Sequence, residues 1–122
     1  MPNFRNLLLK TKSFYKSIGK IRSIHLGNAF VIFGNSGFKH LLMKKRRFRP
    51  IKEQYRKLSL LWSIKEVLNG DIINKSFRVN KDRIYGSVEY HSITVKVKEL
   101  NIKIIIRKIG NGNYHFWSIM DT

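Results

Sequence analysis

The stretch ITVKVKELNIKIIIR, residues 93–107, alternates apolar and polar side chains with a period of two. Each half of it places three apolar residues on one face, namely Ile93, Val95 and Val97, then Ile102, Ile104 and Ile106. Such alternation is typical of strands that bury one face and expose the other. We therefore expect two antiparallel strands here, with their apolar faces turned toward a core.

Strand-like sequence continues on both sides of this stretch. Residues 85–90 are expected to form a further strand and residues 114–120 the last one. The sequence Gly-Asn-Gly-Asn at 110–113 is a strong hairpin signal before that last strand. Residues 74–82 form a polar stretch outside any expected element.

The first half of the chain has mainly helical patterns. Apolar residues recur at helical spacing over residues 4–21, which predicts a helix beginning at Pro2 and Asn3 or, alternatively, a mobile basic arm; we favour the helix. A buried strand over 29–33 precedes a helix that begins near Phe38 with Ser36 as its N-cap. Pro50 then starts a long helix over 51–68. Together these elements predict an α+β fold with N-terminal helices packed on one face of an antiparallel β-sheet.

A chain of 122 residues fits one domain. We expect a single domain over 1–122, in which 1–26 form the N-terminal helix or arm and 29–120 form the core. The absence of cysteine excludes a disulfide scaffold, a cysteine-ligated zinc site and a thiol nucleophile. The apolar run at residues 7–9 is too short to span a bilayer, so no stable membrane insertion is expected.

The charge of the chain points to a polyanionic partner. Lys and Arg total 25 against 7 Asp and Glu, which gives a net charge of +18. A folded domain of this charge repels itself unless a negative partner lies nearby. Nucleic acid is the first candidate, an anionic membrane surface the second and an acidic protein the third. The eight Phe, five Tyr and two Trp indicate a folded core and argue against a disordered basic tail.

Two groups of basic residues are candidates for RNA binding. The densest run consists of Lys44, Lys45, Arg46, Arg47 and Arg49, interrupted by Phe48. The second group lies on the polar face of the expected sheet and consists of Lys96, Lys98, Lys103 and Arg107. On the sheet, solvation explains each residue alone, but a row of like charges is mildly destabilising, and a phosphate partner explains the row better. The run at 44–49 is by itself typical of a solvated face, and the Phe48 within it and the nearby His40 favour nucleic-acid contact.

RNA can be cleaved without a metal, because its 2′-hydroxyl attacks the adjacent phosphate when a protein supplies a base, an acid and cations. His40 beside Lys39 is the leading candidate, and the alternative is an ordinary surface histidine. His115 is a candidate for RNA contact or a histidine that covers the sheet. The acidic residues are scattered and no histidines have zinc spacing, so we expect neither a metal nor another cofactor.

Two further residues have both a functional and a structural interpretation. Ser118 is expected to share a strand face with Phe116 and Met120, where a structural serine is the default interpretation. Arg56, near the start of the long helix, can reach a phosphate or lie along the helix surface.

Three short motifs carry a family resemblance. GFKHLL at 37–42, EQYRKL at 53–58 and YHFWSI at 114–119, with the basic run between the first two, resemble the barnase–EndoU–colicin–RelE (BECR) superfamily of small RNases. The closest similarity is to versions carried by phages and by bacterial polymorphic or contact-dependent toxins. The resemblance covers residues 29–120.

The resemblance implies a two-helix, antiparallel-sheet fold and a metal-independent endoribonuclease toxin, often one that cleaves transfer RNA. It implies a cleft formed by Lys39 and His40, an arginine among Arg46, Arg49 and Arg56, and Ser118. It also implies an acidic immunity protein or antitoxin as partner. The expected place of action is the bacterial cytoplasm, reached as the C-terminal part of a larger secreted or phage protein.

Two other functions remain open from the sequence. A non-catalytic RNA- or DNA-binding module needs the same positive charge without the Lys-His pair. A membrane-surface protein would act through residues 4–22, but polar and apolar residues do not segregate cleanly there.

Overall fold

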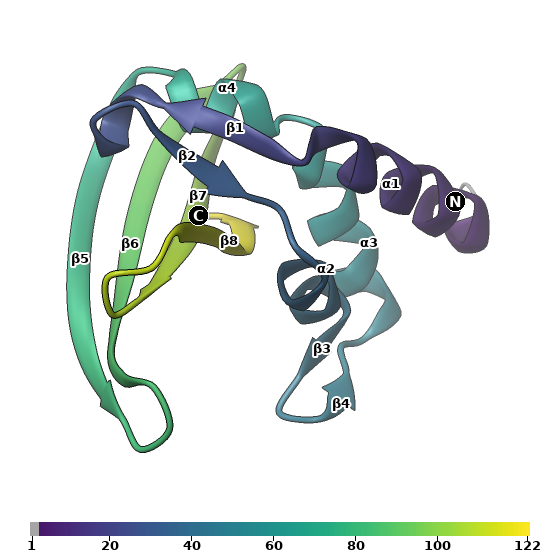
Figure 1. The fold of residues 1–122 in the computed structure, drawn as a ribbon. Helices are drawn as coiled ribbons and strands as arrows, with labels where there is room; N and C mark the ends of the chain where they lie inside the picture. Colours follow the sequence, from purple (N-terminus) through teal and green to yellow (C-terminus); the bar gives the residue numbers. More distant parts are fainter. Residues whose placement is uncertain (1–2) are drawn as a thin grey trace.

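The computed structural model describes residues 3–122, so the expected role of Pro2 lies outside the described residues. The fold is α+β (Figure 1). The helices are α1 (Phe4–Ile18), α2 (Asn35–Leu42), α3 (Ile51–Leu61) and α4 (Ile64–Asn69), with a short 3-10 turn at Ile24–Leu26. The strands are β1 (Lys20–Ser23), β2 (Ala29–Ile32), β3 (Met43–Lys44), β4 (Arg47–Phe48), β5 (Ile72–Asp82), β6 (Gly86–Val97), β7 (Leu100–Ile109) and β8 (Tyr114–Asp121).

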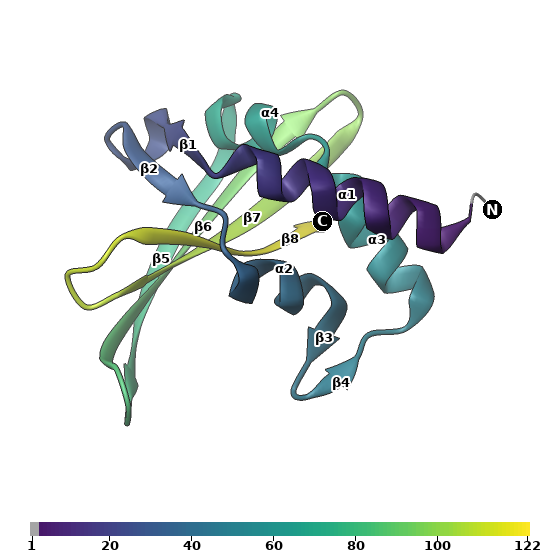
Figure 2. The ribbon, with the colours of Figure 1, turned by 45° about the vertical axis from the view of Figure 1, so that its right-hand side comes forward.

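Six of the strands form one sheet in the order β1-β2-β8-β7-β6-β5, and β3 and β4 form a separate hairpin. Strands β5 to β8 make an antiparallel meander, whereas β2 runs parallel to β8 and pairs only with Tyr114 and His115. In Figure 2 the helices lie to one side of the sheet, and the β3–β4 hairpin extends below α2 and α3. The second half of β8 therefore has a strand neighbour on one side only.

The core forms between the inner face of the sheet and the helices. The sheet contributes Ile93, Val95, Ile102, Ile104 and Ile106, all at most 1% exposed. The helices contribute Phe38, Leu41, Leu58, Leu61, Ile64 and Leu68 to the same cluster. The predicted inner face of residues 93–107 is confirmed.

Two strand predictions need correction. Residues 86–90 and 93–97 belong to one continuous strand, β6, rather than to two, and Tyr85 lies in the turn before it. The polar stretch at 74–82 is part of strand β5, which is exposed at every position. An edge strand without a buried face has no reason to alternate polar and apolar residues, so its sequence gave no strand signal.

Three helix predictions also need correction. Helix α1 ends at Ile18, and the residues after Gly19 form β1. Helix α2 begins at Asn35 with Gly34 as its N-cap, so Ser36 lies inside the helix and does not cap it. The expected long helix divides at Trp62 and Ser63 into α3 and α4.

The division of the long helix follows from the contacts of Trp62. Its ring stacks on Phe14 of α1 at 4.2 Å, and its Nε1 donates a hydrogen bond to Thr11 Oγ1 at 3.0 Å. Trp62 thus packs against α1, and the chain turns so that Ile64 can enter the core. These contacts attach α1 to the rest of the domain.

Gly37 sets the distance between α2 and β8. A Cβ atom built at Gly37 would lie 2.4 Å from the Phe116 carbonyl oxygen and 2.8 Å from the Tyr15 hydroxyl. The Tyr15 hydroxyl is itself fixed, because it donates a hydrogen bond to the Gly34 carbonyl at 2.7 Å. Only glycine allows this close approach of helix and strand.

We expect Gly37→Ala to lower the free energy of unfolding by about 1–3 kcal/mol, because α2 must move away from β8. Chemical denaturation would measure the loss. Gly34→Ala is the matched control, since a Cβ there meets nothing within 4 Å and its φ of −102° suits alanine. Equal stability of the two variants would contradict the close-packing explanation.

Candidate active site

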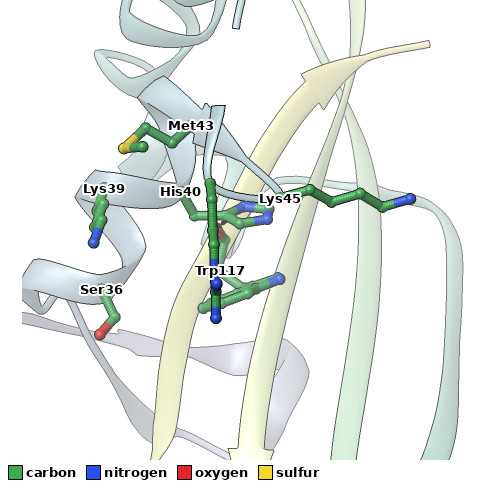
Figure 3. Close-up of a pocket in the computed structure, with 7 residues that line it drawn as sticks. Ser36, Lys39, His40, Met43, Lys45 and Trp117 are labelled. Atoms are coloured by element: carbon green, nitrogen blue, oxygen red, sulfur yellow. Dashed lines mark hydrogen bonds between the residues drawn. The ribbon is translucent and has the colours of Figure 1, made fainter. Parts of the chain in front are cut away.

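A hollow of about 530 Å³ opens where α2, the β3–β4 hairpin and β8 meet (Figure 3). Its lining consists of Ser36, Lys39, His40, Met43, Lys45, Arg46 and Trp117. The structure thus brings the predicted Lys-His pair together with two residues of the basic run. No acidic side chain lines the hollow, so its cations face solvent without an internal counter-charge.

The position of His40 depends on the last strand. Its ring stacks on Trp117 with centroids 4.2 Å apart, and its Nδ1 lies 3.0 Å from the Trp117 carbonyl oxygen. A carbonyl oxygen can only accept, so Nδ1 carries the proton of the neutral ring. The Nε2 atom therefore keeps its lone pair and is the atom able to accept a proton from a ligand.

The surroundings of His40 favour the neutral ring. Burial, followed by the positive charge of Arg49, lowers the pKa of His40 from 6.5 to about 4, and Lys57 and Arg107 act in the same direction. The hydrogen bond to Trp117 opposes this shift without reversing it. At neutral pH the site thus contains an uncharged imidazole surrounded by cations.

Lys57, on α3, resembles His40 in that it is bound to β8 and has a lowered pKa, and it was not predicted from the sequence. Its Nζ donates to the Ile119 carbonyl at 2.8 Å and to Ser118 Oγ at 3.3 Å, and the residue is only 6% exposed. Burial, followed by the charge of Arg49, lowers the pKa of Lys57 to about 8. Its spacing from Gln54 and Leu61, both buried on α3, was the available signal that Lys57 faces inward.

Two cations lie in a strained turn. Lys45 and Arg46 form the two-residue loop between β3 and β4, and their φ angles are 51° and 66°. Loops of this geometry favour Asn-Gly because both positions need positive φ. Non-glycine residues in this region cost free energy, and such strain is concentrated at functional sites. The turn places both side chains beside His40.

Arg49 lies near His40 but is occupied by the protein. Its Nε donates to the His40 carbonyl at 3.1 Å and its Nη1 pairs with Glu53 at 2.7 Å. The residue is 9% exposed. Arg49 therefore fixes the end of α2 and supplies positive charge, but it is not among the residues that line the hollow.

Arg56 and Ser118 do not line the hollow. Arg56 is exposed and forms an ion pair with Asp121 near the end of β8. Ser118 is 2% exposed and contacts Lys57.

Ser118 does not share a face with Phe116 as expected. The pairing of β7 with β8 shifts at a bulge, where Ile105 faces Ser118 and the next residue, Ile106, faces Phe116. Trp117 is the extra residue between these pairs. The bulge breaks the alternation and directs Trp117 to the hollow.

The remaining basic residues divide into separate groups. Lys44 and Arg47 are exposed on the hairpin next to the hollow. Lys96 and Lys98 line a different hollow beside α4, and Lys98 lies in the turn after β6. Lys103 is half-buried on β7. Lys98 thus lies outside the strands on which the row was expected, and Arg107 and His115 face each other across β7 and β8.

Comparisons with family models, curated proteins and solved structures returned no match to this chain. Within residues 3–122, no group of three or more His, Asp or Glu side chains is placed to hold a metal ion. None of the helices described in that range has the length and apolar character needed to cross a membrane.

The His40 environment predicts an unusual titration. The NMR signals of the His40 ring should shift with a midpoint near pH 4, and Lys57→Gln should raise that midpoint by removing a nearby positive charge. Because the unfolded chain binds this proton near 6.5 and the folded chain near 4, the free energy of unfolding should fall as the pH drops through that window. His40→Asn should reduce this loss. A midpoint near 6.5 would contradict the proposed environment.

Proposed function

We propose that the protein is a metal-independent endoribonuclease whose reaction takes place in the His40 hollow. The observation that carries the proposal is the neutral His40 ring, with Nδ1 bound to a carbonyl and Nε2 left as a base among Lys39, Lys45 and Arg46. A base beside cations without an acidic neighbour suits a phosphodiester better than a cationic or neutral substrate.

The reaction would be a transesterification. Nε2 of His40 accepts the proton of the RNA 2′-hydroxyl while the 2′-oxygen forms a bond to phosphorus. The bond from phosphorus to the 5′-oxygen breaks, leaving a 2′,3′-cyclic phosphate, and this oxygen takes a proton from water. The hydroxide formed from that water removes the proton from Nε2, which restores the neutral His40 ring. Lys39, Lys45 and Arg46 offset the negative charge that grows on the phosphoryl oxygens.

Substrate binding would also strengthen the base. The pKa of free His40 is low because of burial and because Arg49, Lys57 and Arg107 repel a second positive charge. A bound phosphate offsets that repulsion and raises the pKa of His40 toward the working pH. The base would thus gain strength when RNA is in place.

The resemblance of the sequence supports a narrower proposal. A BECR-type toxin would cut transfer RNA in the bacterial cytoplasm and be neutralised by an acidic immunity protein or antitoxin. The net charge of +18 suits both partners, since opposite charge speeds association. Of the family-matched residues, Lys39, His40 and Arg46 line the hollow together.

We expect the purified protein to cut bacterial RNA at discrete positions in the presence of EDTA. His40→Asn should slow cleavage about 100- to 10,000-fold, because it keeps a donor for Trp117 but removes the base. Sequencing of the new RNA ends and their 2′,3′-cyclic phosphates would measure this. His91→Asn, on β6 outside the hollow, is the matched control. RNA that is retained at low salt but never cut would favour the non-catalytic binding module instead.

The strained hairpin predicts opposite changes in stability and binding. Replacing Lys45 and Arg46 by Asn and Gly should raise stability, because these residues fit the turn. It should weaken binding of single-stranded RNA, and the slope of log K against log salt should decrease in magnitude by about 1.4, for two lost phosphate contacts. Lys10→Gln with Lys12→Gln, both exposed on α1, removes the same charge elsewhere and should leave the slope unchanged. An unchanged slope in the hairpin variant would contradict the placement of RNA on this turn.

A further inference from the structure

A second, smaller hollow of about 310 Å³ adjoins the His40 hollow. It is lined by the start of α2, residues 34–37, and by side chains of β7 and β8 that include Arg107 and His115. The two hollows share Ser36 and Trp117. A polymer bound in the first hollow can therefore extend directly into the second.

Arg107 is held in place but has no acceptor. Its guanidinium carbon lies 3.9 Å from the centre of the Trp117 ring, and this contact restrains the side chain. Its buried Nε has no hydrogen-bond partner, and within residues 3–122 Arg107 takes part in no ion pair. Burying an unpaired guanidinium nitrogen costs free energy, and an incoming anion would offset that cost.

The rest of the lining also suits an anion. His115 lies opposite Arg107 in the strand register and faces the same hollow. The start of α2 has no side-chain cap and no acidic residue in its first turn. Its first backbone N–H groups therefore lack helical partners and add donors to the side chains of Arg107 and His115. No Asp or Glu lines the hollow.

We propose that this second hollow binds the RNA phosphate next to the one that is cleaved. Arg107 is the main contact, since Trp117 restrains its side chain and its Nε lacks an acceptor. His115 and the backbone of residues 34–37 complete the subsite. The inference rests on the proposed function, because it takes the neighbouring His40 hollow as the place of the scissile phosphate.

The test uses nucleotides that cannot be cleaved. A random pool of 2′-O-methyl dinucleotides is compared with the same pool carrying one extra phosphate, at the 5′ end or at the 3′ end. Binding at low salt should tighten about tenfold with the extra phosphate at one of the two ends, the size expected for charge-assisted hydrogen bonds. The Arg107→Gln variant should lose this gain and bind the phosphorylated and unphosphorylated pools with equal affinity.

Two further variants serve as a control and as a second probe. Arg78→Gln on β5 removes an arginine that also stacks on an aromatic ring, Tyr90, but lies outside the hollow, so it should keep the gain. His115→Asn provides a second probe of the subsite and should also reduce the gain. It decides the test if Arg107→Gln does not fold, which thermal unfolding would reveal.

The inference is overturned if neither terminal phosphate improves binding to the unchanged protein, if no pool binds at low salt, or if Arg107→Gln or a folded His115→Asn keeps the full gain. Failure of the proposed function is seen separately, as intact RNA in the EDTA assay. A protein that shows the phosphate gain but never cuts RNA would keep the subsite and lose the RNase reaction.

Discussion

The unpaired edge of β8 is the constraint on which the site depends. Strand β2 pairs with Tyr114 and His115 and then ends, so the carbonyls of Trp117 and Ile119 need other partners. His40 Nδ1 binds the first and Lys57 Nζ binds the second. Two side chains from α2 and α3 thus take the place of a missing strand. Because these positions are buried, the pKa values of both side chains are lowered.

This arrangement joins stability and chemistry in one residue. The Nδ1 proton of His40 is present in both the neutral and the charged ring, so its bond to Trp117 persists when Nε2 takes up a proton. The ring therefore need not move during a proton transfer. Stacking on Trp117 and the bond from Arg49 to the His40 carbonyl restrict the same residue from other directions. A base fixed in this way loses little free energy to reorganisation.

Much of the fold was predictable because half-buried strands and amphipathic helices have clear periods. Residues 93–107 set the inner face of the sheet, and the Lys-His pair pointed to the hollow. The sequence did not reveal β5, because an exposed edge strand has no periodic burial. It did not reveal the bulge at Trp117, which depends on pairing with β7, and so it misplaced Ser118. Lys57 was missed because its partners, the Ile119 carbonyl and the Ser118 hydroxyl, lie on a strand distant in sequence.

Strand β5 has a consequence for how copies of the protein behave in solution. Its outer edge pairs with no strand in residues 3–122, and Phe77 and Val79 are 63% and 53% exposed on it. Such an edge is a template for adding a strand from another copy. The charge of +18 keeps copies apart at low ionic strength, and that repulsion weakens as salt screens it. The positive charge that we assign to RNA binding therefore also keeps copies of the protein apart. A polyanion that neutralises this charge would allow the exposed β5 edges of different copies to pair.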